Sequence, residues 1–273
     1  MTGRGSTRNA SVELWREYLS NRAKRVRDGR FLVHGRRAIT RGLECGWPLE
    51  TLVYRLGAPE PPEWVRQLLE TSGVTGVGLV PEVMAELAEP SEPVPELVAV
   101  ALTRRPELDE FAPGTPEDPA TVVVIDRPAS AVRLGALIRS AVAFGAGGVI
   151  VTGSGVDHYD PQSVRASDGA LFAIPVLRAS GPAQVAAFRD RQRARGIATR
   201  VVGSDDHGGL ALDDARFDGG TVLVLGDESQ SLGPTWERVC DELVRIPTDG
   251  TLGAPSAAAV ALYEIARQRR ALT

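Results

Sequence analysis

Three continuous apolar runs in the second half of this chain constrain its fold more than any other feature. The runs are TVVVI at 121–125, GGVIV at 147–151 and TVLVL at 221–225. Runs without polar alternation are typical of strands buried on both faces of a parallel sheet. Helical spacing at 132–145 and 182–196 supplies the crossovers that parallel strands require. We therefore predict an open, mostly parallel α/β sheet. Its ligands should bind beyond the carboxyl ends of the strands, in the turns after Ile125, Val151 and Leu225.

Other segments of this half extend the same pattern. We expect further strands at 170–177 and 198–204, a helix at 234–244 and a final alanine-rich helix at 254–271. The preceding segment, 104–119, is rich in proline and acidic residues and has no periodicity, as is typical of a linker.

The first hundred residues also alternate between helical and strand-like segments. Helical spacing is found at 12–19, 36–47, 62–73 and 81–89, and short strand-like runs at 31–35, 50–56 and 74–80. This alternation favours a small α/β sandwich. We therefore predict two domains, 1–103 and 120–273, joined by the linker 104–119.

Basic residues are concentrated at the amino terminus. Residues 1–41 hold eleven basic side chains against three acidic ones, although the whole chain carries a net charge of −4. Arginine binds phosphate bidentately and stacks on bases, so this cluster favours contact with looped or single-stranded RNA over an ordinary solvated helix face. The candidate RNA-binding residues are Arg22, Lys24, Arg25, Arg27, Arg30, Arg36 and Arg37.

Several function classes lack support in the sequence. No apolar run approaches the roughly 18 residues that span a bilayer, and no secretory segment precedes the first helix, so a cytoplasmic protein without membrane contact is expected. The two cysteines, Cys45 and Cys240, lie outside any disulfide or zinc spacing. A glycine-rich dinucleotide motif and a phosphate-binding P-loop are both missing from the sequence.

The second half resembles the SpoU/TrmH branch of the SPOUT RNA methyltransferases in three motifs and one associated segment. DRPASAVRLGALIRSAVAFG carries the first motif with Gly135 and Arg139, and VRASDGALFAIPV resembles the associated Arg-x-Ser-x-Gly segment at Arg165, Ser167 and Gly169. LVLGDESQSLGPTWERVCDELVRIP resembles the second motif and TLGAPSAAAVALYE the third. The amino-terminal third is similar to the avilamycin-resistance type of 23S ribosomal RNA methyltransferase within this family, in RNASVELWREYLSNRAKRVRDGRFLVHGRRAI and GWPLETLVY.

The resemblance implies an amino-terminal domain like ribosomal protein L30e, which presents RNA, and a carboxyl-terminal SPOUT domain with a trefoil knot that binds S-adenosylmethionine and forms a homodimer. It implies 2'-O-ribose methylation of RNA, with 23S ribosomal RNA as substrate and a link to antibiotic resistance. It assigns catalysis to Arg139 and Glu228, and cofactor binding to the backbone of Gly226, Ile246 and Leu252. No metal is required, because the cofactor itself carries the electrophilic methyl group.

The sequence departs from the family at polar positions of these motifs. Arg133 and Gly253 replace the asparagines of the first and third motifs, and Ser229 and Ser231 replace glycines of the second. Loss of a loop glycine removes access to positive φ. An RNA-binding paralogue without catalytic activity is therefore the alternative interpretation, and methylation of a small molecule is a third.

Overall fold

The computed structural model describes residues 3–4, 10–57, 60–89, 92–226 and 232–271. The chain forms two compact units, each described by itself below. The first contains Met1–Arg104 together with Asp157–Ala173, and the second contains Arg105–Val156 and Ile174–Thr273. No helix of the described ranges is long and apolar enough to cross a membrane.

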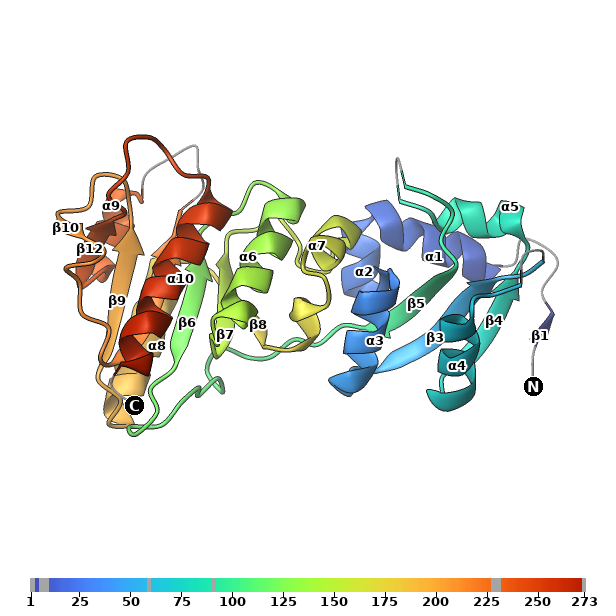
Figure 1. Ribbon diagram of the computed structural model, residues 1–273, viewed down its shortest axis with the longest axis horizontal. Helices are drawn as coiled ribbons and strands as arrows, with labels where there is room; N and C mark the ends of the chain where they lie inside the picture. Colours follow the sequence, from blue (N-terminus) through green and yellow to red (C-terminus); the bar gives the residue numbers. More distant parts are fainter. Residues whose placement is uncertain (1–2, 5–9, 58–59, 90–91, 227–231, 272–273) are drawn as a thin grey trace. The chain divides into compact units, whose positions relative to one another are not determined.

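The first unit is built on a five-stranded sheet with the order β1-β4-β3-β5-β2 (Figure 1). Strands β3 and β4 are parallel, whereas β5 runs antiparallel to both β2 and β3. The strands are β1 (Gly3–Arg4), β2 (Arg30–His34), β3 (Leu49–Arg55), β4 (Thr75–Leu79) and β5 (Leu97–Leu102). The α-helices are α1 (Ala10–Ser20), α2 (Arg22–Asp28), α3 (Arg36–Glu44), α4 (Glu63–Thr71), α5 (Pro81–Met84) and α7 (Pro161–Ala166).

The second unit is a seven-stranded sheet in which every strand pair is parallel, in the order β10-β12-β9-β11-β6-β7-β8. The strands are β6 (Thr121–Ile125), β7 (Gly148–Thr152), β8 (Val176–Ala179), β9 (Thr199–Ser204), β10 (Leu210–Ala211), β11 (Gly220–Leu225) and β12 (Glu242–Arg245). The helices are α6 (Ala131–Ala143), α8 (Pro182–Ala194), α9 (Pro234–Val239) and α10 (Ala254–Arg270). The predicted parallel sheet is therefore confirmed.

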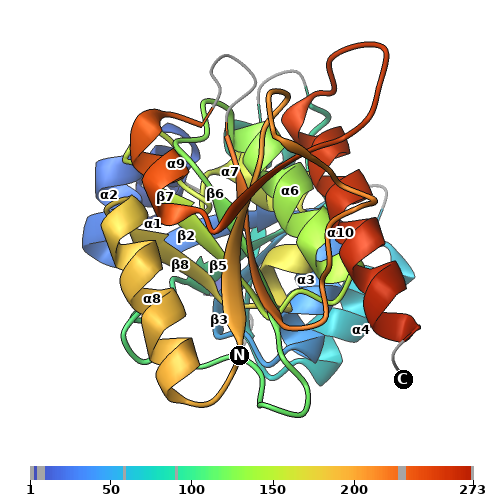
Figure 2. The same ribbon diagram turned by 90° about the vertical axis from the view of Figure 1, so that its left-hand side faces the viewer.

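Helices cover both faces of this second sheet. Figure 2 shows α8 and α9 on one face and α6 and α10 on the other. The three apolar runs are buried over their full length in β6, β7 and β11, as strands enclosed by two helical layers must be. Side chains alternate between the faces, so Val122 and Val124 pack with Phe188 of α8 and Trp236 of α9.

Three predicted elements were wrong in part. The expected helix at 234–244 ends at Val239, because Cys240 takes an extended conformation (φ −66°, ψ 130°) and the chain continues as β12. The expected strand at 170–177 begins with a 3₁₀ turn, Ala170–Phe172, and becomes extended only at Val176. In the first unit, the helix expected at 81–89 is an α-helical turn followed by a 3₁₀ turn, Ala85–Leu87.

The segment expected as a linker packs against the second unit from residue 105 onward. The ring of Phe111 stacks on that of Phe188, with 5.6 Å between the centroids. Arg191 of α8 donates to the carbonyl of Leu108 at 2.8 Å, and Arg195 donates to that of Gly114 at 3.1 Å. The segment lacks helix and strand, as its composition predicts, but aromatic and guanidinium contacts hold it in place.

Candidate functional site

The carboxyl ends of β6, β7 and β11 meet at one edge of the parallel sheet. Asp126 follows β6 directly and is 4% exposed, and its amide donates to the carbonyl of Leu225 at 2.8 Å. The hydroxyl of Thr152, at the end of β7, donates to Oδ1 of Asp126 at 2.5 Å. Nε of Arg127 donates to Oδ2 of the same carboxylate at 2.9 Å. Asp126 thus joins the ends of three adjacent strands, through its amide to β11 and through its buried carboxylate to β7.

The proposed cofactor-binding residues lie in loops around the same edge. Gly226 follows β11, Ile246 follows β12 and Leu252 precedes α10, and all three are half-buried. No hydrogen bond to another described residue is found for their main-chain N–H and C=O groups. Backbone groups that stay unpaired at half-buried positions remain available for a ligand.

The carboxylate of Asp205, just after β9, fixes one end of the second-motif segment. This side chain is 7% exposed, and its Oδ2 accepts the amide of Leu232 at 2.8 Å while Oδ1 accepts that of His207 at 2.9 Å. Glu228, Ser229 and Ser231 lie outside the described residues. Asp205 was not identified in the sequence analysis, although its place after a buried strand is the signal that would have found it.

The first-motif arginines lie on the exposed side of α6, whose buried side includes Leu134, Gly135 and Ile138. The helix starts at the sheet edge, where the Ser130 side chain accepts the amide of Arg133. With a rise of about 1.5 Å per residue, Arg139 lies roughly 13 Å along the axis from this N-cap. The edge therefore gathers Asp126, Gly226 and Ile246, whereas Arg139 sits further along the helix.

One candidate RNA-binding residue is buried. Arg25 of α2 is 2% exposed and binds two carboxylates, with Nε 3.1 Å from Asp157 and Nη2 3.1 Å from Asp160. Its Nη1 donates to the carbonyl of Tyr18 at 2.8 Å. A buried charge stays ionised only when it is paired in this way. We therefore remove Arg25 from the RNA-facing set, because its guanidinium is enclosed and engaged.

The remaining cations of this group have different partners. Lys24 is 19% exposed, between Glu17 and Asp28, and Arg30 forms a two-bond pair with Glu50. The most accessible side chains are those of Arg27, which is 68% exposed, and Arg37, which is 78% exposed.

Arg36 is also exposed, and its guanidinium lies 5.7 Å from the centroid of the Trp64 ring. Trp64 was missed in the sequence analysis. Arg22 is half-buried on α2.

The residues of the Arg-x-Ser-x-Gly segment stabilise the first unit. Arg165 pairs with Glu92 and lies 3.8 Å from Oε2 of Glu89. The buried hydroxyl of Ser167 donates to a carbonyl of α7 at 2.7 Å. Gly169 has φ of 88°, and a Cβ there would lie 2.8 Å from Cβ of Arg41. The segment therefore depends on glycine for both conformation and space.

Glu89 also faces a histidine. Nδ1 of His34 lies 3.4 Å from Oε1 of Glu89, and the other ring nitrogen is 2.8 Å from the carbonyl of Leu87. That nitrogen must donate, since a carbonyl only accepts. Burial lowers the pKa of His34 and raises the pKa of Glu89, because it disfavours the charged form of each group.

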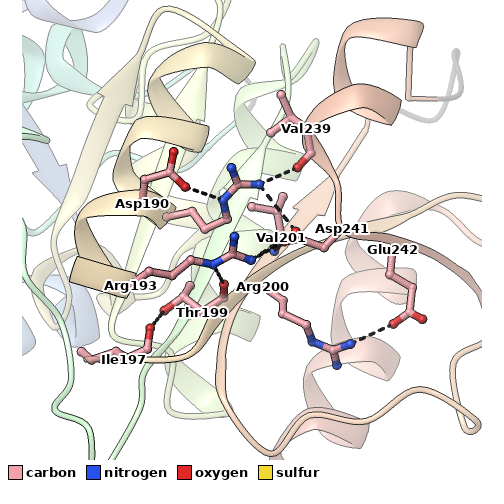
Figure 3. A network of polar contacts seen from close by, with 10 residues as sticks. Asp190, Arg193, Ile197, Thr199, Arg200, Val201, Val239, Asp241 and Glu242 are labelled. Carbon is pink, nitrogen blue, oxygen red and sulfur yellow. Dashed lines mark hydrogen bonds and ion pairs between the residues drawn. The ribbon is translucent and has the colours of Figure 1, made fainter. Parts of the chain in front are cut away.

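The network drawn in Figure 3 lies at the opposite, amino-terminal edge of the parallel sheet. Asp241, which precedes β12, binds Arg193 at 3.1 Å and accepts the amide of Val201 at 2.8 Å. Arg200 pairs with Glu242 at 3.5 Å. Each of these carboxylates has a cationic partner, so the network joins α8, β9 and β12 structurally, and the candidate site is the carboxyl edge.

Comparisons with known proteins identify the family to which this chain belongs. The model of the SpoU rRNA Methylase family matches residues 120–263, and that of the SpoU L30e-like domain matches residues 9–99. A Streptomyces viridochromogenes protein described as 23S rRNA (uridine(2479)-2'-O)-methyltransferase is 41% identical over 267 residues, covering 97% of this chain and 92% of its own.

Solved structures show the same fold. The SpoU methyltransferase AviRb from Streptomyces viridochromogenes, in complex with AdoMet, superposes with a TM-score of 0.90 at 40% identity, over 96% of this chain and 99% of its own. An AdoMet-bound rRNA methyltransferase from Sinorhizobium meliloti gives a TM-score of 0.82 at 26% identity, over 100% and 99% of the two chains.

Proposed function

Because the chain belongs to the SpoU rRNA methylase family, we propose that it transfers a methyl group from S-adenosylmethionine to a ribose 2'-hydroxyl of 23S ribosomal RNA. The observation that carries the proposal is the match to an RNA 2'-O-methyltransferase over nearly the full length of both chains. Function is set by a site and not by a fold, so the residues at the carboxyl edge have to account for it.

The loops at this edge suit S-adenosylmethionine. We propose that the main-chain groups of Gly226, Ile246 and Leu252, which have no hydrogen-bond partner among the described residues, bind its adenine and methionine parts. Main-chain recognition tolerates side-chain change, so replacements elsewhere in the three motifs do not remove these contacts. The bound cofactor supplies the methyl group as an electrophile and needs no metal for this transfer.

The chain's part in the reaction is to hold and activate the 2'-hydroxyl. Arginine is always protonated in proteins, so Arg139 is suited to stabilise the developing negative charge on the oxygen. We propose Glu228 as the carboxylate that orients this guanidinium through paired hydrogen bonds. Arg133, exposed near the start of α6, adds positive charge for the RNA phosphates.

We propose that residues 1–103 form the RNA-binding domain, 104–119 the connection and 120–273 the methyltransferase domain with its knot. The RNA-facing side chains are Arg22, Lys24, Arg27, Arg30, Arg36 and Arg37. Their exposed members, together with Trp64, offer charge to phosphates and a ring face to a base.

A homodimer in the cytoplasm completes the proposal. The second unit has three large hydrophobic side chains that are exposed in the described ranges, and all lie on α6 or α10: Val132, Val260 and Tyr263. Apolar side chains gathered on two packed helices favour burial against a second copy. Ribosomal RNA as the substrate places the protein in the cytoplasm.

The test is transfer of label from radioactive S-adenosylmethionine to 23S ribosomal RNA, followed by mapping of the methylated ribose. We expect Arg139→Ala to abolish labelling, whereas Arg216→Ala, an exposed arginine just before β11, leaves it unchanged. If the protein neither binds the cofactor in calorimetry nor labels RNA, the enzymatic proposal fails. Salt-dependent RNA binding without cofactor binding would then support the catalytically inactive paralogue. Resistance is tested by the growth of cells expressing the protein in avilamycin.

A further inference from the structure

The turn after β6 holds a charged side chain in a conformation that L-residues rarely adopt. Arg127 has φ of 45°, and Asp168 is the other non-glycine residue with positive φ in the part of the chain described here. A strained backbone conformation of this kind persists only where the surrounding residues hold it in place. The amide of Arg127 donates to Oγ1 of Thr152 at 3.1 Å. A Cβ on the neighbouring Gly153 would lie only 2.9 Å from Cγ of Arg127.

The described residues around Arg127 orient its guanidinium through Nε and form no contact with its two terminal nitrogens. Its Nε is held 2.9 Å from the carboxylate of Asp126, which is itself buried and held by Thr152. No described residue forms a hydrogen bond or ion pair with either terminal nitrogen, and the side chain is 60% exposed. A guanidinium fixed at Nε with both terminal nitrogens open suits bidentate binding of a phosphate.

Arg127 lies beside one proposed cofactor contact and away from another. It follows β6, which pairs with β11, so its turn is one strand spacing of about 4.8 Å from that of Gly226. In the strand order β12-β9-β11-β6-β7, Ile246 follows the first of these strands and Arg127 follows the fourth. Three strand spacings of about 4.8 Å place these two turns roughly 14 Å apart along the edge. An exposed cation at this end of the row of proposed cofactor contacts is accessible to a large polyanion.

We infer that Arg127 binds a backbone phosphate of the substrate RNA at the carboxyl edge of the parallel sheet. The inference rests on the proposed function and deepens it by naming a substrate-binding residue within the second unit. Asp126 and Thr152 act as positioning residues, because they hold the arginine in its left-handed conformation without facing the substrate. Phosphate contacts of this kind fix the register of RNA on the protein.

The test compares Arg127→Gln with Arg216→Gln, using 23S ribosomal RNA transcribed in vitro. Arg216 is also exposed but precedes β11, so it lies at the other edge of the sheet. We expect Arg127→Gln to raise KM for RNA about tenfold, as loss of a charged hydrogen-bond partner does, with kcat changed less than twofold. Arg127→Lys should recover part of the loss, because it keeps the charge without the planar fork. Arg216→Gln should match the wild type.

Two further measurements separate binding from folding and from the proposed reaction. Arg127→Gly and Arg127→Gln both remove the cationic partner of Asp126, but only the Gly variant relieves the positive φ. Its Tm should therefore exceed that of Arg127→Gln, while RNA binding weakens equally in the two variants. RNA binding measured against salt concentration should lose about one unit of slope in both the Gln and Gly variants. This slope decides the inference even if the wild type transfers no methyl group, a result that would end the proposed function alone. An unchanged slope, or weaker cofactor binding in calorimetry without RNA, would overturn the role of Arg127.

Discussion

Replacing the buried arginine of α2 tests how the first unit is held together. In Arg25→Met the side chain keeps most of its apolar length but loses three polar contacts, to Asp157, Asp160 and the carbonyl of Tyr18. Asp157 is only 10% exposed, so its charge stays behind without a cationic partner. Breaking one partner of a buried ion pair costs about 3 to 5 kcal/mol, and we expect a loss of unfolding free energy in this range.

A matched control lies two residues away on the same helix. Arg27 is 68% exposed and pairs with its neighbour Asp28, so Arg27→Met should cost at most about 1 kcal/mol. Urea unfolding followed by tryptophan fluorescence suits the comparison, because Trp15, Trp47 and Trp64 lie in the first unit and only the fourth tryptophan lies in the second.

Equal losses in the two variants would refute the reasoning from burial. The double variant Arg25→Met/Asp157→Asn supplies a further check, since removing both charges should recover part of the loss.

Three further substitutions test other features. Burial raises the pKa of Glu89, so the folded protein binds the proton of this carboxyl more tightly than the unfolded chain does. The stability of the wild type therefore falls as pH rises above about 4.5. In thermal unfolding, Glu89→Gln should gain more stability over the wild type at pH 8 than at pH 4. Gly169→Ala should cost about 1 to 3 kcal/mol in urea unfolding, and more than Gly73→Ala, because both have positive φ but only Gly169 is crowded, by Arg41. Phe111→Ala should cost about 3 kcal/mol by loss of its stacked contact, and an unchanged urea midpoint would mean that the segment after residue 104 is not held by this ring.

Local sequence patterns predicted strands β6, β7 and β11 of the parallel sheet because their burial is continuous. Every residue of β6, β7 and β11 is buried, so the apolar runs were sufficient to identify them. The segment 234–244 kept helical spacing beyond Val239, yet its last residues became β12. Pairing of Val244 with Ser204 of β9 decides this, and such a distant partner leaves no local signal in the sequence.

Fewer features of the candidate site could be predicted, because these also depend on partners that lie far away along the chain. The turns after β6 and β11 were expected to carry function, and the sequence led to Gly226 directly. The burial of Arg25 was not foreseeable, because it stands among exposed cations and its partner Asp157 lies 132 residues further along the chain. The left-handed conformation of Arg127 likewise depends on Thr152, which belongs to another strand.

The discontinuous path of the first unit limits how this protein can be divided or recombined. A gene fragment ending at residue 104 would lack Asp157, and it would also lack Tyr159 and Phe172, whose rings pack on Phe31. The missing piece lies between β7 and β8, inside the sequence of the other unit. Exchange of residues 1–104 between relatives by a single crossover would therefore pair them with a foreign segment 157–173. Residues 1–104 and 157–173 therefore have to come from the same parent if the first unit is to keep its packing.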